Sequence, residues 1–191
     1  MDCIVSLSAG ILCVRYHKHN DRLMHEIGID CGGILVPLMV SIEGTPLDAW
    51  PVSPPMQQMV QDTIHEGLSP VLLGVGSSGN GHWSCAIESH DNAWLKFDIA
   101  CKNSKRSTTL GSSYQLISDL EWNVEMNRLD LKIPDAYASS GFSGLSLKAS
   151  IGKIVHDPEQ KRVAIAPSSS PDEIRTHRWC YSILAGKTKL V

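Results

Sequence analysis

The segment from residue 81 to residue 98 constrains the fold of this chain more than any other part of the sequence. Residues 81–88 and 94–98 are typical of two β-strands, and the polar residues 89–92 between them are typical of a turn. Antiparallel pairing would place Asp98 beside His82, because neighbouring strands lie about 5 Å apart. One imidazole nitrogen could then bond to the carboxylate while the other acts as a base, as in a nucleophile, base and orienter triad. The alternative is an ordinary hairpin with a histidine at its mouth.

The residue pattern of this segment resembles a known catalytic motif. Gly81, His82 and an aromatic residue precede an apolar strand and a polar turn, and Trp-x-x-Phe-Asp follows, ending at Asp98. This order is similar to the histidine box of papain-like cysteine peptidases, above all ubiquitin-specific proteases, and more distantly to transglutaminase-like proteins. The resemblance implies that His82 is the general base and that Asp98 holds it. Ile99 stands where ubiquitin-specific proteases usually carry a second acidic residue.

A cysteine near the start of the chain is the candidate nucleophile. Cys31 is followed by Gly32 and Gly33 and then by an apolar run over residues 34–42. If this run is a buried helix, the sulfur lies at its N-terminus, where the macrodipole favours the thiolate. The glycines would let a substrate backbone approach and let the Cys31 amide point at an oxyanion. Pro37 leaves open a loop or strand instead, and Cys31 could also be a small buried hydrophobe.

The same stretch is similar to bacteriocin-leader peptidases, which are another papain-like family. The shared pattern is Asp-Cys-Gly, an apolar run of helical length and a closing glycine, here Gly44. In that family a glutamine six residues before the cysteine completes the oxyanion hole. The matching position here is His25, and the resemblance therefore implies that His25 donates to the oxyanion.

The other segments predict an α+β fold, with an N-terminal helical part packed on an antiparallel sheet. Residues 15–22 are expected to form an exposed polar loop, and residues 55–67 a helix with apolar positions on one face. Residues 70–75 should form a strand and residues 76–81 a flexible turn. We expect a papain-like catalytic domain over residues 1–134. A β-rich extension or subdomain over residues 135–191 would include a hairpin formed by residues 151–156 and 162–166.

Composition limits the function classes. The chain has 191 residues, 42% hydrophobic and 19% charged, with a formal net charge of -3 and a pI near 6.2. This balance argues against a nucleic-acid partner, and no apolar run approaches a membrane span. Six cysteines without a C-x-x-C pair and without an export signal favour free thiols in the cytoplasm. No cofactor or metal is expected; the alternative is a zinc site using Cys13, His17 and His19.

Together these observations predict a cysteine hydrolase, a peptidase or amidase that acts on a peptide or protein through a thioester acyl-enzyme. Cys31 would attack, His82 would move the proton, and Asp98 would orient the imidazole. The alternative is a catalytically inactive papain-like module that binds a peptide in the same cleft. The accessory residues are two oxyanion donors, His25 and Asn80, and five cleft residues, Gly32, Gly33, Gly81, Trp83 and Trp50.

Overall fold

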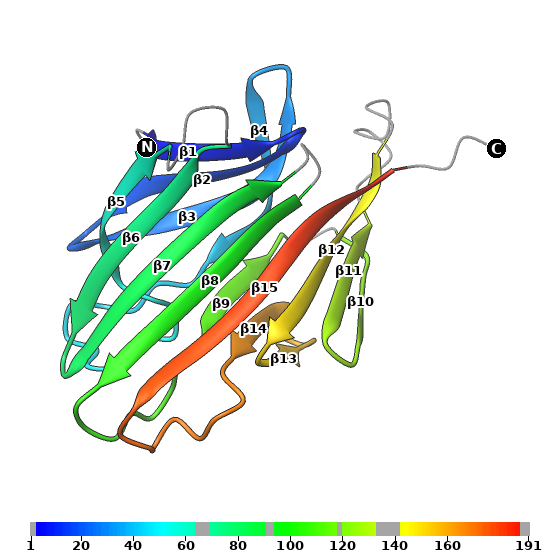
Figure 1. Ribbon diagram of the computed structural model, residues 1–191. Coiled ribbons are helices and arrows are strands. Elements are labelled where there is room, and N and C mark those ends of the chain that lie inside the picture. The colour runs from blue at the N-terminus through cyan, green and yellow to red at the C-terminus, as the bar shows by residue number, and fades with distance from the viewer. Residues whose placement is uncertain (1–2, 64–68, 91–93, 118–119, 133–141, 188–191) are drawn as a thin grey trace.

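The chain folds into strands that form two antiparallel sheets (Figure 1). The computed structural model describes residues 3–63, 69–90, 94–117, 120–132 and 142–187. Within them the strands are β1 (Cys3–Ala9), β2 (Leu12–His19), β3 (Arg22–Cys31), β4 (Ile34–Ser41), β5 (Met56–Asp62), β6 (Val71–Ser78), β7 (Gly81–His90), β8 (Trp94–Asn103), β9 (Ser112–Leu116), β10 (Trp122–Glu125), β11 (Arg128–Lys132), β12 (Phe142–Ile151), β13 (Lys153–Asp157), β14 (Arg162–Ala166) and β15 (Thr176–Lys187).

One sheet has seven strands in the order β1-β2-β3-β4-β9-β14-β13. The other has eight in the order β10-β11-β12-β15-β8-β7-β6-β5. In Figure 1 the eight-stranded sheet lies in front of the seven-stranded one. The described residues contain no helix, and so none that could cross a membrane.

Alternation along the strands produces the core between the two sheets. In β7 the side chains of Trp83, Cys85 and Ile87 are buried, whereas those of His82 and Ser84 are exposed. The same period of two runs through β8, β11 and β12, so each strand presents one apolar face inward and one polar face outward. Burial of these apolar faces is the main force that holds the sheets together.

A hydrogen-bonded polar group also lies in this core. His25 Nε2 is 3.0 Å from Tyr114 Oη, and Tyr114 Oη in turn bonds to Tyr181 Oη across the two sheets. Trp179 Nε1 donates to Ser112 Oγ over 2.9 Å. Burial lowers the pKa of His25 to about 3, so the imidazole is neutral and shares the network as donor or acceptor.

The expected α+β class is wrong, and two strands explain the error. The apolar run after Cys31 is β4, in which Pro37 lies opposite Gly28 at a β-bulge, a position where a proline fits a sheet. Met56 and Met59 were expected on one helix face. They both point inward from β5 because a bulge between residues 56 and 58 shifts the alternation. The last part of the expected helix, residues 64–67, lies outside the described residues.

The expected loop near the N-terminus is wrong, whereas the expected C-terminal hairpin is confirmed. Residues 15–22 are not an exposed loop: most belong to β2, and Arg22, at the start of β3, is 1% exposed. The expected C-terminal hairpin is present as β13 and β14. This hairpin belongs to the seven-stranded sheet, where β14 pairs with β9, whereas β15, which follows it in the chain, pairs with β8 of the eight-stranded sheet. The expected boundary at residue 134 lies outside the described residues.

Candidate functional site

The hairpin of β7 and β8 does not bring the expected base and orienter together. His82 lies opposite Lys102, and Asp98 lies opposite Ala86. Four residues of strand therefore separate Asp98 from the position beside His82, which is about 13 Å. Asp98 instead accepts hydrogen bonds from Arg178 on β15, with Nε to Oδ1 at 2.8 Å, and this guanidinium lowers the pKa of the Asp98 carboxyl.

Cys31 belongs to the other sheet and ends β3. It pairs with Ile34 across a two-residue turn made by Gly32 and Gly33, whose φ angles are 67° and 89°. Positive φ at both turn positions is the requirement of a type I′ hairpin turn, so hairpin geometry accounts for the glycine pair. His82 is exposed on the outer face of the opposite sheet, and stacked sheets lie about 10 Å apart. The described geometry therefore does not assemble Cys31, His82 and Asp98 into a triad.

The other expected site residues are structural in position. His25 is buried in the core network described above. The carbonyl of Asn80, in the turn between β6 and β7, accepts the amide of Ser104 over 3.1 Å. The ring of Trp83 is buried and packs against that of Trp50, with ring centroids 5.9 Å apart. A Cβ added to Gly81 would lie 2.4 Å from the Trp83 ring, so this glycine makes room for an indole.

The residues of the alternative zinc site do not converge either. Cys13, His17 and His19 lie along the outer face of β2, whereas His25 points into the core. Across the described part of the chain, no three His, Cys, Asp or Glu side chains are placed to hold a metal ion.

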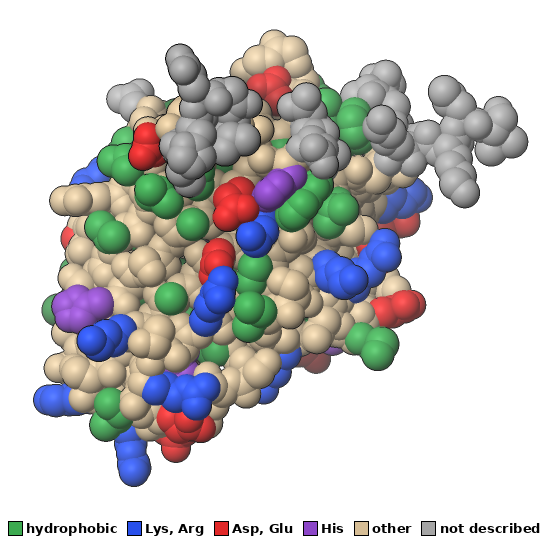
Figure 2. Space-filling model, in the orientation of Figure 1, with side chains coloured by type: hydrophobic (Ala, Val, Ile, Leu, Met, Phe, Trp, Pro, Cys, Tyr) green, Lys and Arg blue, Asp and Glu red, His purple; other side chains and the backbone are tan. Residues whose placement is uncertain are grey.

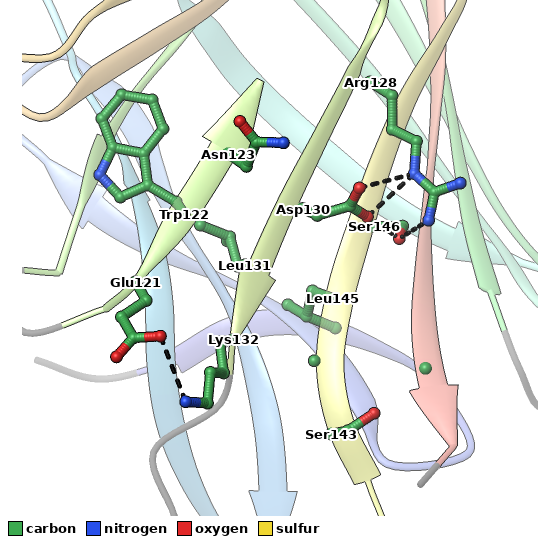
Figure 3. A pocket seen from close by; sticks show the side chains of 12 residues that line it. Glu121, Trp122, Asn123, Arg128, Asp130, Leu131, Lys132, Ser143, Leu145 and Ser146 are labelled. Atoms are coloured by element: carbon green, nitrogen blue, oxygen red, sulfur yellow. Dashed lines mark hydrogen bonds and ion pairs between the residues drawn. The ribbon is translucent and has the colours of Figure 1, made fainter. Parts of the chain in front are cut away.

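The eight-stranded sheet instead carries a polar hollow of about 490 Å³ over β10, β11, β12 and the end of β15 (Figure 3). Alternation builds it, because buried leucines of β11 and β12 point into the core while their polar neighbours point outward. Gly144 lies in its floor, where an added Cβ would lie 2.4 Å from the Leu131 carbonyl oxygen. The lining residues are Glu121, Trp122, Asn123, Arg128, Asp130, Leu131, Lys132, Ser143, Gly144, Leu145, Ser146 and Gly186.

The charges in this hollow are arranged in pairs. Arg128 donates from Nε to Asp130 over 2.9 Å and from Nη2 to Ser146 Oγ over 3.0 Å, and Ser146 Oγ also bonds to Asp130. Lys132 Nζ donates to Glu121 over 3.2 Å. Such exposed pairs add only about 0–1 kcal/mol to stability. Their effect is to hold donors and acceptors in fixed places on a surface whose formal charges cancel.

Trp122, the one indole among the described lining residues, does not lie over the hollow as a flat platform. Figure 3 shows the Trp122 ring pointing away from Arg128, Asp130 and Ser146. It forms a T-shaped pair with the His156 ring of β13, with ring centroids 5.9 Å apart. Among the described residues, no histidine or cysteine lines the hollow. The arrangement offers hydrogen-bond recognition.

The same sheet has a basic end, defined here as Lys102, Lys105 and Arg106. These side chains are exposed at and after the end of β8, and none of them makes an ion pair with another described residue. Figure 2 shows Lys and Arg side chains gathered at its lower left, where β8 ends and β15 begins in Figure 1. The loop that carries them is held in place, since the amide of Ser104 donates to the Asn80 carbonyl and that of Ser107 to the Pro171 carbonyl.

The comparisons with known proteins give information about the fold only. The structure of heparinase III matches with a TM-score of 0.52 and 10% sequence identity, over 95% of this chain and 36% of that one. A form of heparinase III with methylated lysines matches with a TM-score of 0.48 and 10% identity, over 95% of this chain and 35% of that one. No family model and no curated protein matches. The chain therefore spans about a third of the length of the solved structures it matches.

The sequence analysis did not predict the hollow, although the residues of one strand that lines it show a recognisable pattern. Arg128, Asp130 and Lys132 alternate with Leu129 and Leu131, which is the pattern of a strand with one charged face. What the sequence did not show is that β12 and β15 would pair beside this strand and complete the surface.

Proposed function

We propose that this chain is a non-catalytic β-sandwich module that binds an acidic polysaccharide along the outer face of its eight-stranded sheet. The observation that carries the proposal is the placement of the hollow and the basic end on one face of one sheet. In register, Asp130 lies opposite Ser146, Ser146 opposite Leu184, and Leu184 opposite Trp94. From Trp94, every second residue of β8 points outward as far as Lys102.

The surface between the two sites suits a long, flexible polar chain. The hollow includes Gly186 near one end of β15, and Arg178, eight residues away, lies beside the basic end, a span of about 27 Å. The side chains between them along β15 include Ser182 and Leu184. Lys148 on β12 is exposed on the same face, opposite Ser182. It adds a cation between the hollow and the basic end.

The chemistry of the two sites selects the ligand class. In the hollow, carboxylate, guanidinium, amide and hydroxyl groups can exchange paired hydrogen bonds with sugar hydroxyls, and the net charge of zero leaves neutral sugars acceptable. At the basic end, three exposed cations, of which Arg106 also lies near the Asp172 carboxylate, favour sulfate or carboxylate groups. The fold match supports the same class, since it is to a protein whose name, heparinase, denotes action on heparin.

A nucleic acid is a poorer candidate for this surface. The chain carries a formal net charge of -3. Asp98 and Glu88 are spaced among the cations of this face and pair with Arg178 and Lys96. A continuous phosphate backbone needs a denser basic track than this.

The test is binding of heparin oligosaccharides by titration calorimetry at low and physiological salt. The triple variant Lys102→Ala, Lys105→Ala, Arg106→Ala should bind about tenfold or more weakly, because three charge contacts of about 0.5–1 kcal/mol each are lost. Its binding should also depend less on salt. The matched control, Lys18→Ala with Lys153→Ala and Arg162→Ala, removes the same charges from the other sheet and should bind like the parent.

A second substitution tests the hollow. Asp130→Asn removes the carboxylate that Arg128 and Ser146 share and should weaken heparin binding about tenfold, whereas Asp62→Asn on β5 of the same sheet should not. Equal binding by the parent and the triple variant, or tighter binding of duplex DNA than of heparin, would refute the proposal.

A further inference from the structure

The seven-stranded sheet carries a second hollow that differs in chemistry from the first. It has a volume of about 540 Å³ and lies on the outer face of β9, β13 and β14. Register defines its floor, because Val155 of β13 lies opposite Ala164 of β14, and Ala164 lies opposite Ser113 of β9. Small alanine side chains between larger neighbours leave the depression open.

The walls of this hollow are two chain segments fixed by hydrogen bonds. One wall is residues 167–171, a Pro-Ser-Ser-Ser-Pro segment in which Ser169 Oγ bonds to His177 Nδ1 over 2.7 Å. The opposite wall includes Leu110 and Val52, and the Val52 carbonyl accepts Ser113 Oγ over 2.8 Å. Walls held in this way need little ordering when a ligand enters, which lowers the entropic cost of binding.

The lining is mainly apolar, with a single charge. Val52 and Val155 are 40% and 48% exposed, which is high for valine side chains. Lys153 lies opposite Ala166 in the floor and is the only formally charged side chain among the described residues of the lining. Within the described residues its ammonium has no ion-pair or hydrogen-bond partner. Serine hydroxyls of residues 168–170 lie at the same hollow.

From this lining we infer a binding site for an amphipathic carboxylate, a small molecule with an apolar body and one carboxylate group. The apolar body would lie over Val155 and Ala164, where it removes exposed apolar surface from water. The carboxylate would lie at Lys153, with the Ser168 hydroxyl as a further donor, because the hydroxyls of Ser169 and Ser170 bond to His177 and Asp172. A phosphate or sulfate monoester is less well matched, because a single lysine lacks the bidentate fork or the cation cluster that such groups favour.

This inference is independent of the proposed polysaccharide site, since the two hollows lie on the outer faces of different sheets. Neither site shares a residue with the other. Failure of one would leave the other untouched.

The experiment uses octanoate as the probe, with acetate and octanamide as matched compounds that keep only the charge or only the apolar body. Titration followed by amide chemical shifts should show saturable octanoate binding, with the largest shifts in β13 and β14. Acetate and octanamide should each bind about tenfold or more weakly. Octyl sulfate tests the headgroup and should bind more weakly than octanoate.

Two substitutions test separately the contacts of the apolar body and of the carboxylate of the ligand. Ala164→Leu fills the floor on an outward-facing position and should abolish octanoate binding, and Lys153→Met keeps the aliphatic stem and should reduce octanoate to the affinity of octanamide. Lys18→Met, on β2 of the same sheet and outside the lining, is the control and should bind octanoate normally. Unchanged octanoate binding in Ala164→Leu would overturn the site, and equal binding of octanoate and octanamide by the parent would overturn the role of Lys153.

Discussion

A half-buried carboxyl group gives the sharpest prediction about stability. Glu43 follows β4, and its Oε1 accepts the Ser41 hydroxyl over 2.7 Å. Its Oε2 is buried and has no hydrogen-bond partner among the described residues. Burial raises the pKa of Glu43 from 4.5 to about 7, against the smaller opposing effects of Ser41 and Arg22. The unfolded chain therefore ionises Glu43 at a lower pH than the folded chain does.

The sign of the effect follows from this difference. Between pH 4.5 and pH 7 the unfolded state releases the proton that the folded state retains, so the free energy of unfolding falls as pH rises. A pKa difference of 4.5 to about 7 corresponds to about 3 kcal/mol, because each pH unit is worth about 1.4 kcal/mol. Glu43→Gln removes this loss. The variant should therefore be more stable than the parent by about 3 kcal/mol at pH 8, and by about 1 kcal/mol or less at pH 5.

Urea unfolding followed by tryptophan fluorescence at pH 5 and pH 8 measures the difference. Loss of stability in acid from His25, whose pKa is lowered to about 3, affects both proteins equally and cancels. Glu159→Gln, at an exposed position, is the control and should show no pH-dependent gain. If Glu43→Gln changes stability by the same amount at both pH values, Glu43 does not titrate in the way that its burial requires.

Two further predictions concern backbone packing and the thiols. In urea unfolding, Gly28→Ala should destabilise the protein by about 3 kcal/mol, because the new Cβ would lie 2.0 Å from the fixed backbone oxygen of Val36. Gly74→Ala should cost only about 1 kcal/mol, because its Cβ would lie 2.1 Å from a methionine sulfur that can move. Equal costs for the two variants would contradict the clash argument. In the native protein a thiol reagent should modify the exposed Cys3 and the half-buried Cys31, and early modification of any other thiol, detected by mass spectrometry, would contradict the burial pattern. The thiols expected to react only after unfolding are Cys13, Cys85, Cys101 and Cys180.

The sequence predicted some local structure well and long-range pairing poorly. The hairpin of β7 and β8 was visible because a strand with one buried face alternates in a simple way. The register of this hairpin could not be predicted, because both strands extend beyond the expected limits, β7 to His90 and β8 to Asn103. As a result, Asp98 lies opposite Ala86 and not beside His82. Strand register depends on turn geometry and on partners elsewhere in the chain.

The false helix has a physical origin of a different kind. Met56 and Met59 are three residues apart, which is the spacing of one helix face, and a β-bulge gives the same spacing on one face of a strand. The candidate cysteine site failed for a similar reason, since two glycines serve a hairpin turn as well as an oxyanion hole. The hollows could not be predicted because their linings combine strands from distant parts of the chain.

The position of β15 affects how the protein can be made. This strand lies between β8 and β12, so the larger sheet has a gap in its middle until Thr176–Lys187 have been synthesised. Before then β8 presents an unsatisfied edge on the ribosome, where it can pair with the wrong strand or with another nascent chain. Completion of the larger sheet therefore depends on a long-range pairing step between β15 and strands that precede it by many residues, which slows folding.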